Sequence, residues 1–322
     1  MRDVRGRCAV VTGGGSGMGR ELVRQLAAAG CHVATCDVSQ DALADTKALA
    51  DESAPAGTLV TTFVADVADE TQWLDFREHV TSEHHTDCIH LLFNNAGIGG
   101  GGSFLNDDRA AWDATFAVCW GGVYLGCRTF LPLLIAADEA HIVNTSSVNG
   151  FWASLGPTTP HTAYSAAKFA VKGFTEALIT DLRMNAPHVH ASVVTPGHIG
   201  TGIVLNSFRY FGLDPKHLEE QQIAQLRQRL TAQGIDVSSA SDEDLANGMQ
   251  LQAEMFRDLA PTSAAQAATI ILEGVRDNRW RILVGDDATK LDELVRATPE
   301  DAYEASFMAH ARAEGVFRAL TM

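Results

Sequence analysis

The stretch VTGGGSGMGR (residues 11–20) decides the fold, because its five glycines join the end of a β-rich run to the start of a helical pattern. Glycine lets a backbone turn tightly and approach a pyrophosphate, which then rests on the helix N-terminus. A glycine loop alone is a weak signal, but its position directly after the first strand of a βαβ unit strengthens it. The stretch therefore predicts a dinucleotide-binding loop, with a flexible turn as the alternative.

Outward from this loop, β-rich and helical patterns alternate along the chain. The β-rich runs are 8–13, 32–37, 59–66, 89–97, 141–147, 190–197 and 280–285, and the helical stretches between them are 18–29, 40–52, 70–83, 108–136, 162–186 and 262–275. Such alternation indicates βαβ units with right-handed crossovers. The pattern predicts an α/β fold of the Rossmann type: a doubly wound, mainly parallel seven-stranded sheet with helices on both faces.

The whole chain, 1–322, is interpreted as a single Rossmann-type domain with two helical additions. Residues 202–261 are predicted to be an insertion of two helices, one beginning at Asp214-Pro215 and stopping at Gly234, the other beginning near Asp242. The insertion follows a strand end, where open α/β sheets bind ligands, so it is either a substrate lid or a packing pair. Residues 286–322 form a C-terminal helical extension that contains a further capped helix.

Composition narrows the classes of partner. The formal net charge of -16 argues against nucleic acid, which requires a basic surface. The apolar runs are no longer than strands, so no membrane span is expected. The six cysteines form no CxxC pair, which predicts reduced thiols, no zinc site and a cytoplasmic location.

An acidic residue ends the second predicted strand. Asp37 could accept hydrogen bonds from the ribose hydroxyls of an adenosine and repel a 2′-phosphate. No basic residue replaces it, since Val38 follows and Ser16 occupies the loop. The pattern favours NAD over NADP, although Asp37 could also cap the helix that begins at Gln40.

Six motifs occur in order: TGGGSGMG, the pair Asp66-Val67, NNAG (94–97), the serine of NTSSVNG, YSAAK and TPGHIGT. Together they resemble the short-chain dehydrogenase/reductase family, single-domain type, over about residues 5–201 and 262–285. The resemblance implies an NAD-dependent alcohol dehydrogenase or ketone reductase acting on a small molecule. It also implies a homotetramer or homodimer, assembled through the long helices.

Residue roles follow from the resemblance position by position. The implied cofactor-binding residues are Gly13, Ser16, Gly17, Met18 and Gly19 in the loop, Asp37 and Val38 at the ribose, Asp66 and Val67 at the adenine, Asn94, Ala96 and Gly97 beside the cofactor, and Ile199 and Thr201 after the Pro-Gly pair at 196–197. The implied catalytic trio is Ser147, Tyr164 and Lys168, of which Tyr164 and Lys168 also contact the cofactor. Ser146 is a weaker candidate for the serine.

The segment AYSAAK (163–168) places a phenol and an ammonium one helical turn apart. A free phenol has a pKa of about 10, and a nearby cation lowers it. Tyr164 could then accept the alcohol proton as hydride leaves, or donate it in reverse. Ser147 would hydrogen-bond the substrate oxygen, and Lys168 would hold the ribose hydroxyls.

Two departures from the family pattern matter. Cys119 lies where the family usually has an asparagine, which leaves a catalytically impaired NAD-binding sensor as the alternative function. The segment between Ser147 and Tyr164 is longer than usual, and it contains FWASLGPTTPHTA (151–163). Phe151 and Trp152 are expected to line a roomy apolar pocket for a bulky hydrophobic alcohol or ketone. A sugar-nucleotide epimerase is disfavoured by NNAG.

Overall fold

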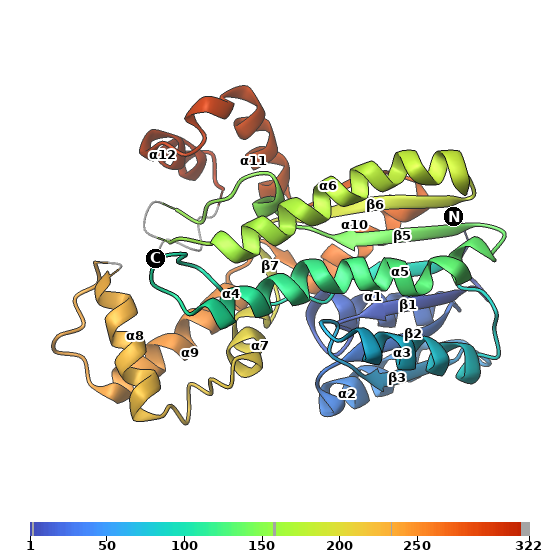
Figure 1. Cartoon of the computed structure of the whole chain (residues 1–322), viewed down its shortest axis with the longest axis horizontal. Helices are drawn as coiled ribbons and strands as arrows, with labels where there is room; N and C mark the ends of the chain where they lie inside the picture. The colour runs from blue at the N-terminus through green and yellow to red at the C-terminus, as the bar shows by residue number, and fades with distance from the viewer. Residues whose placement is uncertain (2, 157–158, 233, 317–322) are drawn as a thin grey trace.

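The computed structural model describes residues 1, 3–156, 159–232 and 234–316, and its centre is a seven-stranded sheet (Figure 1). The strands are β1 (Cys8–Thr12), β2 (His32–Asp37), β3 (Val60–Val64), β4 (Leu91–Asn94), β5 (Ala140–Thr145), β6 (Val189–Pro196) and β9 (Arg281–Val284). Their order is β3-β2-β1-β4-β5-β6-β9, and every pairing is parallel. The predicted sheet is therefore confirmed, and it is parallel throughout. The order reverses between β1 and β4, which is where doubly wound sheets bind ligands.

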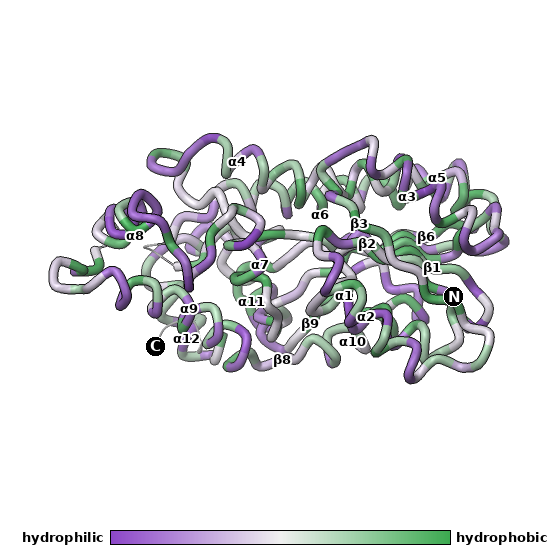
Figure 2. The backbone as a smooth tube through the Cα atoms, turned by 90° about the horizontal axis from the view of Figure 1, so that it is seen from below, coloured by the Kyte–Doolittle hydropathy of each residue, from purple (hydrophilic) through white to green (hydrophobic). Residues whose placement is uncertain are grey.

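Helices cover both faces of the sheet. The first face carries α1 (Gly17–Ala28), α2 (Gln40–Ser53) and α10 (Ala264–Arg276), and the second carries α3 (Glu70–Glu83), α5 (Gly122–Ile135) and α6 (Thr162–Asn185). Figure 2 shows the hydrophobic strands between these two layers. Buried apolar side chains fill both interfaces, for example Phe76 and Phe130 on the second face and Leu22 and Ile271 on the first. These clusters supply the apolar burial that stabilises the sheet.

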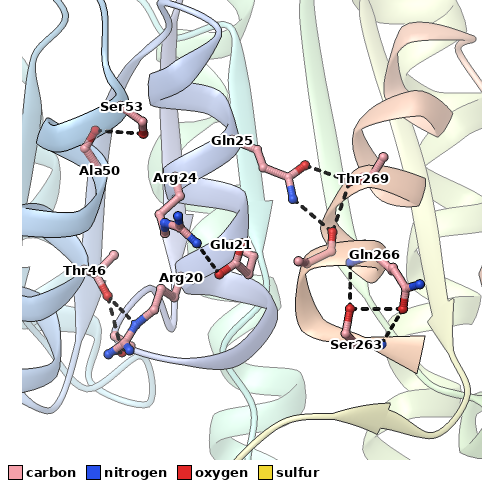
Figure 3. Close-up of polar contacts among 12 residues, drawn as sticks. Arg20, Glu21, Arg24, Gln25, Thr46, Ala50, Ser53, Ser263, Gln266 and Thr269 are labelled. Carbon is pink, nitrogen blue, oxygen red and sulfur yellow. Dashed lines mark hydrogen bonds and ion pairs between the residues drawn. The ribbon is translucent and has the colours of Figure 1, made fainter. Parts of the chain in front are cut away.

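Polar contacts also join α1 to α10. The Gln25 side chain donates to the Ala265 carbonyl at 2.9 Å and accepts from the Thr269 hydroxyl at 3.0 Å (Figure 3). A capping box of Ser263 and Gln266 begins α10. The helix that follows the insertion is thus fastened to the helix that follows the glycine loop.

The predicted helix 108–136 has a wide turn in its middle. The structure divides it into α4 (Arg109–Phe116), a π-helix η1 (Ala117–Gly121) and α5. By length and composition alone, 109–135 could cross a membrane, because its best window has a mean hydropathy of 1.4. The expectation that no stretch reaches that length is therefore wrong: it considered only uninterrupted apolar runs. Half of the window is buried within the protein, as in the core helix of a soluble fold.

The insertion contains three helices, so the prediction of two is wrong. They are α7 (Ile203–Tyr210), α8 (Glu220–Ala232) and α9 (Asp242–Asp258). The predicted start at Asp214-Pro215 is also wrong, because the Asp214 carboxylate accepts the Lys216 N–H at 3.0 Å and forms a turn. At the base of the insertion, β7 (Ile199–Gly200) pairs with β8 (Thr262–Ser263).

The C-terminal extension consists of α11 (Asp286–Ala297), a 3₁₀ turn (Pro299–Asp301) and α12 (Ala305–Ala313); the last part of the predicted extension, 317–322, lies outside the described residues. Its apolar side chains pack against the 3₁₀ turn η2 (Val148–Gly150), directly after Ser147. Figures 1 and 2 both place the insertion and the extension at the end of the molecule opposite the N-terminus. Both additions therefore surround the strand ends that carry the predicted site.

Candidate active site

The glycine loop begins where β1 ends. The Thr12 hydroxyl accepts the Asn95 and Ala96 N–H groups, each at 3.0 Å, and joins the end of β1 to the end of β4. A Cβ on Gly19 would collide with the Gly13 carbonyl, and Gly13 itself has a φ of 67°. Only glycine fits this approach of the loop to α1.

The N-terminus of α1 is suited to an anion. Ser16 is its N-cap residue, yet its side chain makes no capping hydrogen bond. The first turn also holds no acidic side chain that would repel a negative charge. Its amides and helix dipole therefore fit the diphosphate of a dinucleotide, the group that the loop was predicted to bind.

Arg20 supports the loop from behind, a role that the sequence reasoning missed. Its guanidinium donates to the Gly15 carbonyl at 2.6 and 3.1 Å and to the Thr46 hydroxyl of α2 at 3.0 Å (Figure 3). The guanidinium is therefore engaged in fixing the loop. The one sequence signal for this role was the position of Arg20, directly after the last glycine of the stretch 11–20.

Asp37 lies beside the glycine loop. One carboxylate oxygen accepts the Gly15 N–H at 3.0 Å and the other accepts the Ser39 N–H at 3.1 Å. The side-chain cap of α2 is Ser39 and not Asp37, because Ser39 accepts the Ala42 N–H. The acid is thus placed at the loop, and Val38 is exposed next to it.

Asp66 and Val67 follow β3 and point in different ways. The Asp66 carboxylate accepts the Ala68 N–H at 2.9 Å and the Tyr210 hydroxyl at 3.1 Å. The Val67 side chain is buried in the core, and its carbonyl accepts the Trp73 indole N–H at 2.8 Å. Of the two side chains, Asp66 is the one placed to recognise a ligand.

In the segment after β4, one predicted residue likewise faces the protein interior and another lies at the predicted site. The Asn94 side chain is buried and donates to Asn144 at 2.8 Å, so it links β4 to β5 within the protein. Ala96 is held by Thr12. A Cβ on Gly97 would lie 3.4 Å from the Lys168 Nζ and 3.7 Å from the Cys119 Sγ, which places Gly97 beside Lys168 of the predicted trio.

The structure brings Ser147, Tyr164 and Lys168 together. The Lys168 Nζ lies 5.4 Å from the centre of the Tyr164 ring and donates to the Thr145 carbonyl at 2.9 Å. The Ser147 hydroxyl accepts the Asn149 N–H at 3.1 Å and is close enough to the Tyr164 phenol to lower its pKa. Ser146 is buried and donates to the Lys168 carbonyl at 2.8 Å, so it supports α6, and Ser147 stays the predicted catalytic serine.

The pKa of Tyr164 moves opposite to the expectation. Burial raises the pKa of the phenol, the Cys119 thiol adds to the rise, and the hydrogen bond from Ser147 opposes it. Burial likewise lowers the pKa of Lys168. In the protein alone, desolvation is the largest cause and decides the direction of the shift. Tyr164 is therefore a protonated phenol at neutral pH, which suits proton donation to a carbonyl.

Cys119 lies in the π-helical turn, at the position where the resemblance expects asparagine. Its thiol is buried and donates to the Ile98 carbonyl at 3.2 Å. The turn is widened by a bond from the Gly122 N–H to the Ala117 carbonyl. Such π-bulges occur often at functional sites.

Hydrogen bonds of His198 and Asp287, two residues that the sequence did not single out, hold the turn after β6 in place. The His198 N–H donates to the Asp287 carboxylate of α11 at 2.6 Å, and the His198 ring meets the Phe256 carbonyl of α9 at 2.6 Å. A Cβ on Gly197 would collide with the same carboxylate. Of the predicted residues after the Pro-Gly pair, Ile199 is buried, whereas Thr201 lies against Gly17 of the loop.

His161, also missed, lies beside the phenol. Its ring centre is 4.7 Å from that of Tyr164, and burial lowers its pKa to about 4. The imidazole is therefore neutral near pH 7. The signal was its position one turn before Tyr164, at the start of the same helix.

The prediction that Trp152 lines a substrate pocket is wrong. The side chain is fully buried, its ring centre is 5.8 Å from that of Phe307 in α12, and its indole N–H donates to the Ala302 carbonyl at 2.6 Å. Phe151 packs against the same cluster. The C-terminal extension covers these rings because they offer an apolar surface. Residues 157–158 of this predicted loop lie outside the described residues.

Within the described ranges, no group of three or more His, Cys, Asp or Glu side chains is arranged to hold a metal ion. All six cysteines are described, and each is a free thiol. The site therefore consists of a hydroxyl, a phenol, an ammonium and an anion-binding loop.

The geometry agrees with the similarities of the chain to known proteins. A family model described as short chain dehydrogenase matches residues 7–209. The SadH protein of Mycobacterium tuberculosis is 33% identical over 297 residues, which cover 92% of each chain. Levodione reductase of Leifsonia aquatica is 35% identical over 212 residues, which cover 66% of this chain and 75% of that enzyme.

Crystal structures with a bound nicotinamide cofactor are among those similar to this fold. A short-chain dehydrogenase/reductase of Burkholderia phymatum in complex with NAD superposes with a TM-score of 0.72 at 29% identity, over 93% of this chain and 96% of that one. A metagenomic short-chain oxidoreductase in complex with NADP has a TM-score of 0.53 at 25% identity, over 81% of this chain and 96% of that one. Similar folds therefore bind either nicotinamide cofactor.

Proposed function

Because the chain belongs to the short-chain dehydrogenase/reductase family, we propose that it interconverts a secondary alcohol and a ketone by hydride transfer with NAD. The coarse class, an oxidoreductase of this family, follows from the family match. The observation that carries the finer proposal is the Tyr164 phenol, placed beside the Lys168 ammonium and near the buried Ser147 hydroxyl. A protein that only binds a nucleotide has no use for this trio.

The residues divide the chemistry among them. Tyr164 moves the proton at its phenol oxygen, donating it to the carbonyl oxygen in reduction and accepting it in oxidation. Ser147 donates a hydrogen bond to the substrate oxygen and stabilises the charge that develops there. Lys168 holds ribose hydroxyls and keeps a positive charge near the phenol. The nicotinamide cofactor, when bound, supplies or takes the hydride.

NAD is the proposed cofactor on the basis of Asp37. Its carboxylate is fixed beside the glycine loop by the Gly15 and Ser39 N–H groups. A fixed negative charge at this place favours ribose hydroxyls and disfavours a 2′-phosphate. Arg20, the cation nearest in sequence to the loop, is engaged behind it.

A bulky hydrophobic substrate is the proposed class. The loop between β4 and α4 exposes two large apolar side chains, Phe104 (75% exposed) and Leu105 (90% exposed). Its glycines reach the insertion, since a Cβ on Gly100 would meet the Phe211 ring at 2.7 Å. Similarity to levodione reductase supports reduction of a carbonyl compound.

The proposed assembly is a homodimer or homotetramer through the long helices, and the proposed location is cytoplasmic. Tyr124 of α5 and Phe169 of α6 are each 42% exposed, as expected of helices that pair with a second copy. The six free thiols fit a reducing compartment. Light scattering coupled to size-exclusion chromatography tests the assembly.

The test is NADH formation at 340 nm across a panel of secondary alcohols, with NAD or NADP, for the wild type and Tyr164→Phe. We expect turnover with NAD that Tyr164→Phe abolishes, with circular dichroism showing an intact fold. NADH binding without turnover on any alcohol, or on the matching ketones in reverse, would contradict the dehydrogenase and support the sensor alternative.

A further inference from the structure

Helix α7 touches three segments of the predicted cofactor site. The Asn206 amide donates to the Ser16 hydroxyl of the glycine loop at 2.9 Å. The Tyr210 hydroxyl donates to the Asp66 carboxylate at 3.1 Å. The Ser207 hydroxyl accepts the Gly99 N–H at 2.8 Å and is buried. Each contact joins the insertion to a loop at the carboxyl end of a different strand.

The spacing of Asn206 and Tyr210 lets α7 contact the glycine loop and Asp66 at the same time. Residues 206 and 210 are four apart, so they lie on one face of α7, about 6 Å apart along its axis. Their partners are in the loop that fits a diphosphate and in the acid implied for the adenine. One helix face therefore contacts both the residue that would lie at the diphosphate and the residue that would lie at the adenine.

Asp66, Tyr210 and Asn206 each have the hydrogen-bonding capacity that a contact with a bound dinucleotide requires. The Asp66 carboxylate is held from two sides, by the Ala68 N–H and by Tyr210, and a carboxylate can accept further hydrogen bonds. Burial and the nearby Asp66 carboxylate raise the pKa of Tyr210 to about 12, so the phenol remains a donor at neutral pH. The Asn206 amide has a second N–H besides the one that it donates to Ser16.

We propose that α7 is a clamp on the cofactor, in which Tyr210 orients the Asp66 carboxylate toward the adenine amino group and Asn206 orients Ser16 at the diphosphate. This inference rests on the proposed function, because it assumes that a nicotinamide dinucleotide binds. Tyr210 and Asn206 are positioning residues, since they act through Asp66 and Ser16. The insertion then contributes to cofactor affinity and does more than cover substrate.

The experiment is a fluorescence titration of the full chain with NADH. The variants are Tyr210→Phe and Asn206→Ala, and Arg209→Ala is the control, because Arg209 is an exposed neighbour on the same helix. We expect Tyr210→Phe to weaken NADH binding about tenfold, the effect of losing one hydrogen bond to a charged group. ADP-ribose should lose the same factor, whereas reduced nicotinamide mononucleotide should lose nothing.

A double-mutant cycle with Asp66→Ala separates positioning from general stability. If Tyr210 acts through Asp66, Tyr210→Phe should cause no further loss of NADH affinity in the Asp66→Ala background. An unchanged or tighter affinity of Tyr210→Phe for NADH in the otherwise wild-type chain would overturn the clamp.

Hydrogen exchange gives an independent readout. NADH should slow exchange of the α7 amides in the wild type, and less so in a chain carrying both Tyr210→Phe and Asn206→Ala; equal protection would contradict the clamp. A wild type that binds neither NADH nor NADPH would overturn the proposed function along with the clamp. Tight NADH binding that ignores both substitutions would overturn the clamp alone.

Discussion

Helix α8 of the insertion lies beyond the carboxyl ends of the sheet strands, on the side away from the N-terminus, and the protein restrains these two regions differently (Figure 1). At the edge, Ser147 and Lys168 are 8% and 2% exposed, and main-chain groups fix both side chains. In α8, none of the side chains described over 220–231 is buried. The side chains at the carboxyl ends of the strands are therefore held in a fixed geometry, whereas α8 is a solvated helix that few contacts restrain. We therefore expect substitutions near the carboxyl ends of the strands to change activity or stability more than substitutions in α8.

The largest effect is expected at Lys168. Lys168→Met keeps the length of the buried stem but removes the charge near the phenol, so kcat should fall about 10²-fold or more. The pKa of Tyr164 should rise further without the cation, and the rate of alcohol oxidation should therefore increase only at higher pH than in the wild type. Steady-state kinetics as a function of pH measures both.

The matched control is Lys172→Met. Lys172 is one turn further along α6 and pairs with Glu176 at 2.9 Å. Its substitution should leave kcat and the pH profile unchanged. Equal losses in the two variants would mean that Lys168 acts only as a helix residue.

The next effect is a loss of stability at Trp152, which joins the edge to the C-terminal extension. Trp152→Ala removes a fully buried ring and should lower the free energy of unfolding by about 3–5 kcal/mol. Denaturant unfolding measures it. Trp280→Ala, at an exposed tryptophan, should cost far less; a similar cost for both would show that the extension is not part of the cooperative fold.

Asp287 should produce a smaller effect that depends on pH. Burial raises the pKa of this carboxyl, so the folded state holds its proton more tightly than the unfolded state. Its contribution to stability is then largest below the ordinary value of about 3.9 and is lost as pH rises through the raised pKa. Asp287→Asn lacks this titration, so the Tm of the wild type minus that of the variant should grow as pH falls through this window.

The neighbouring Asp286→Asn is the control for thermal unfolding, because Asp286 is exposed. Its Tm difference from the wild type should stay flat over the same pH range. A flat difference for Asp287→Asn as well would contradict the burial argument.

The smallest effect is expected in α8. Gln225 is exposed, so Gln225→Ala should change the free energy of unfolding by no more than about 0.5 kcal/mol and should leave NADH affinity unchanged. Thermal unfolding and NADH titration check this. A large loss of either quantity would break the contrast between the edge and α8.

The sequence predicted the sheet well because its strands are continuous apolar runs separated by helical periodicity. It also brought Ser147, Tyr164 and Lys168 into one site, since each belongs to a local motif. It could not predict α7 or the burial of Trp152, because both depend on contacts between segments far apart in the chain. A polar residue such as Tyr210 carries no local mark of the carboxylate that it meets.

The buried amides of the sheet have a consequence for strand alignment. Asn94 of β4 and Asn144 of β5 are direct neighbours in the ladder, and their side chains bond at 2.8 Å. Asn144 continues to the Thr175 hydroxyl of α6 at 3.0 Å. A slip of β4 against β5 by one residue would turn an amide to the opposite face and leave its partner unpaired in the interior. This pair of buried amides therefore favours the observed register over one shifted by a residue.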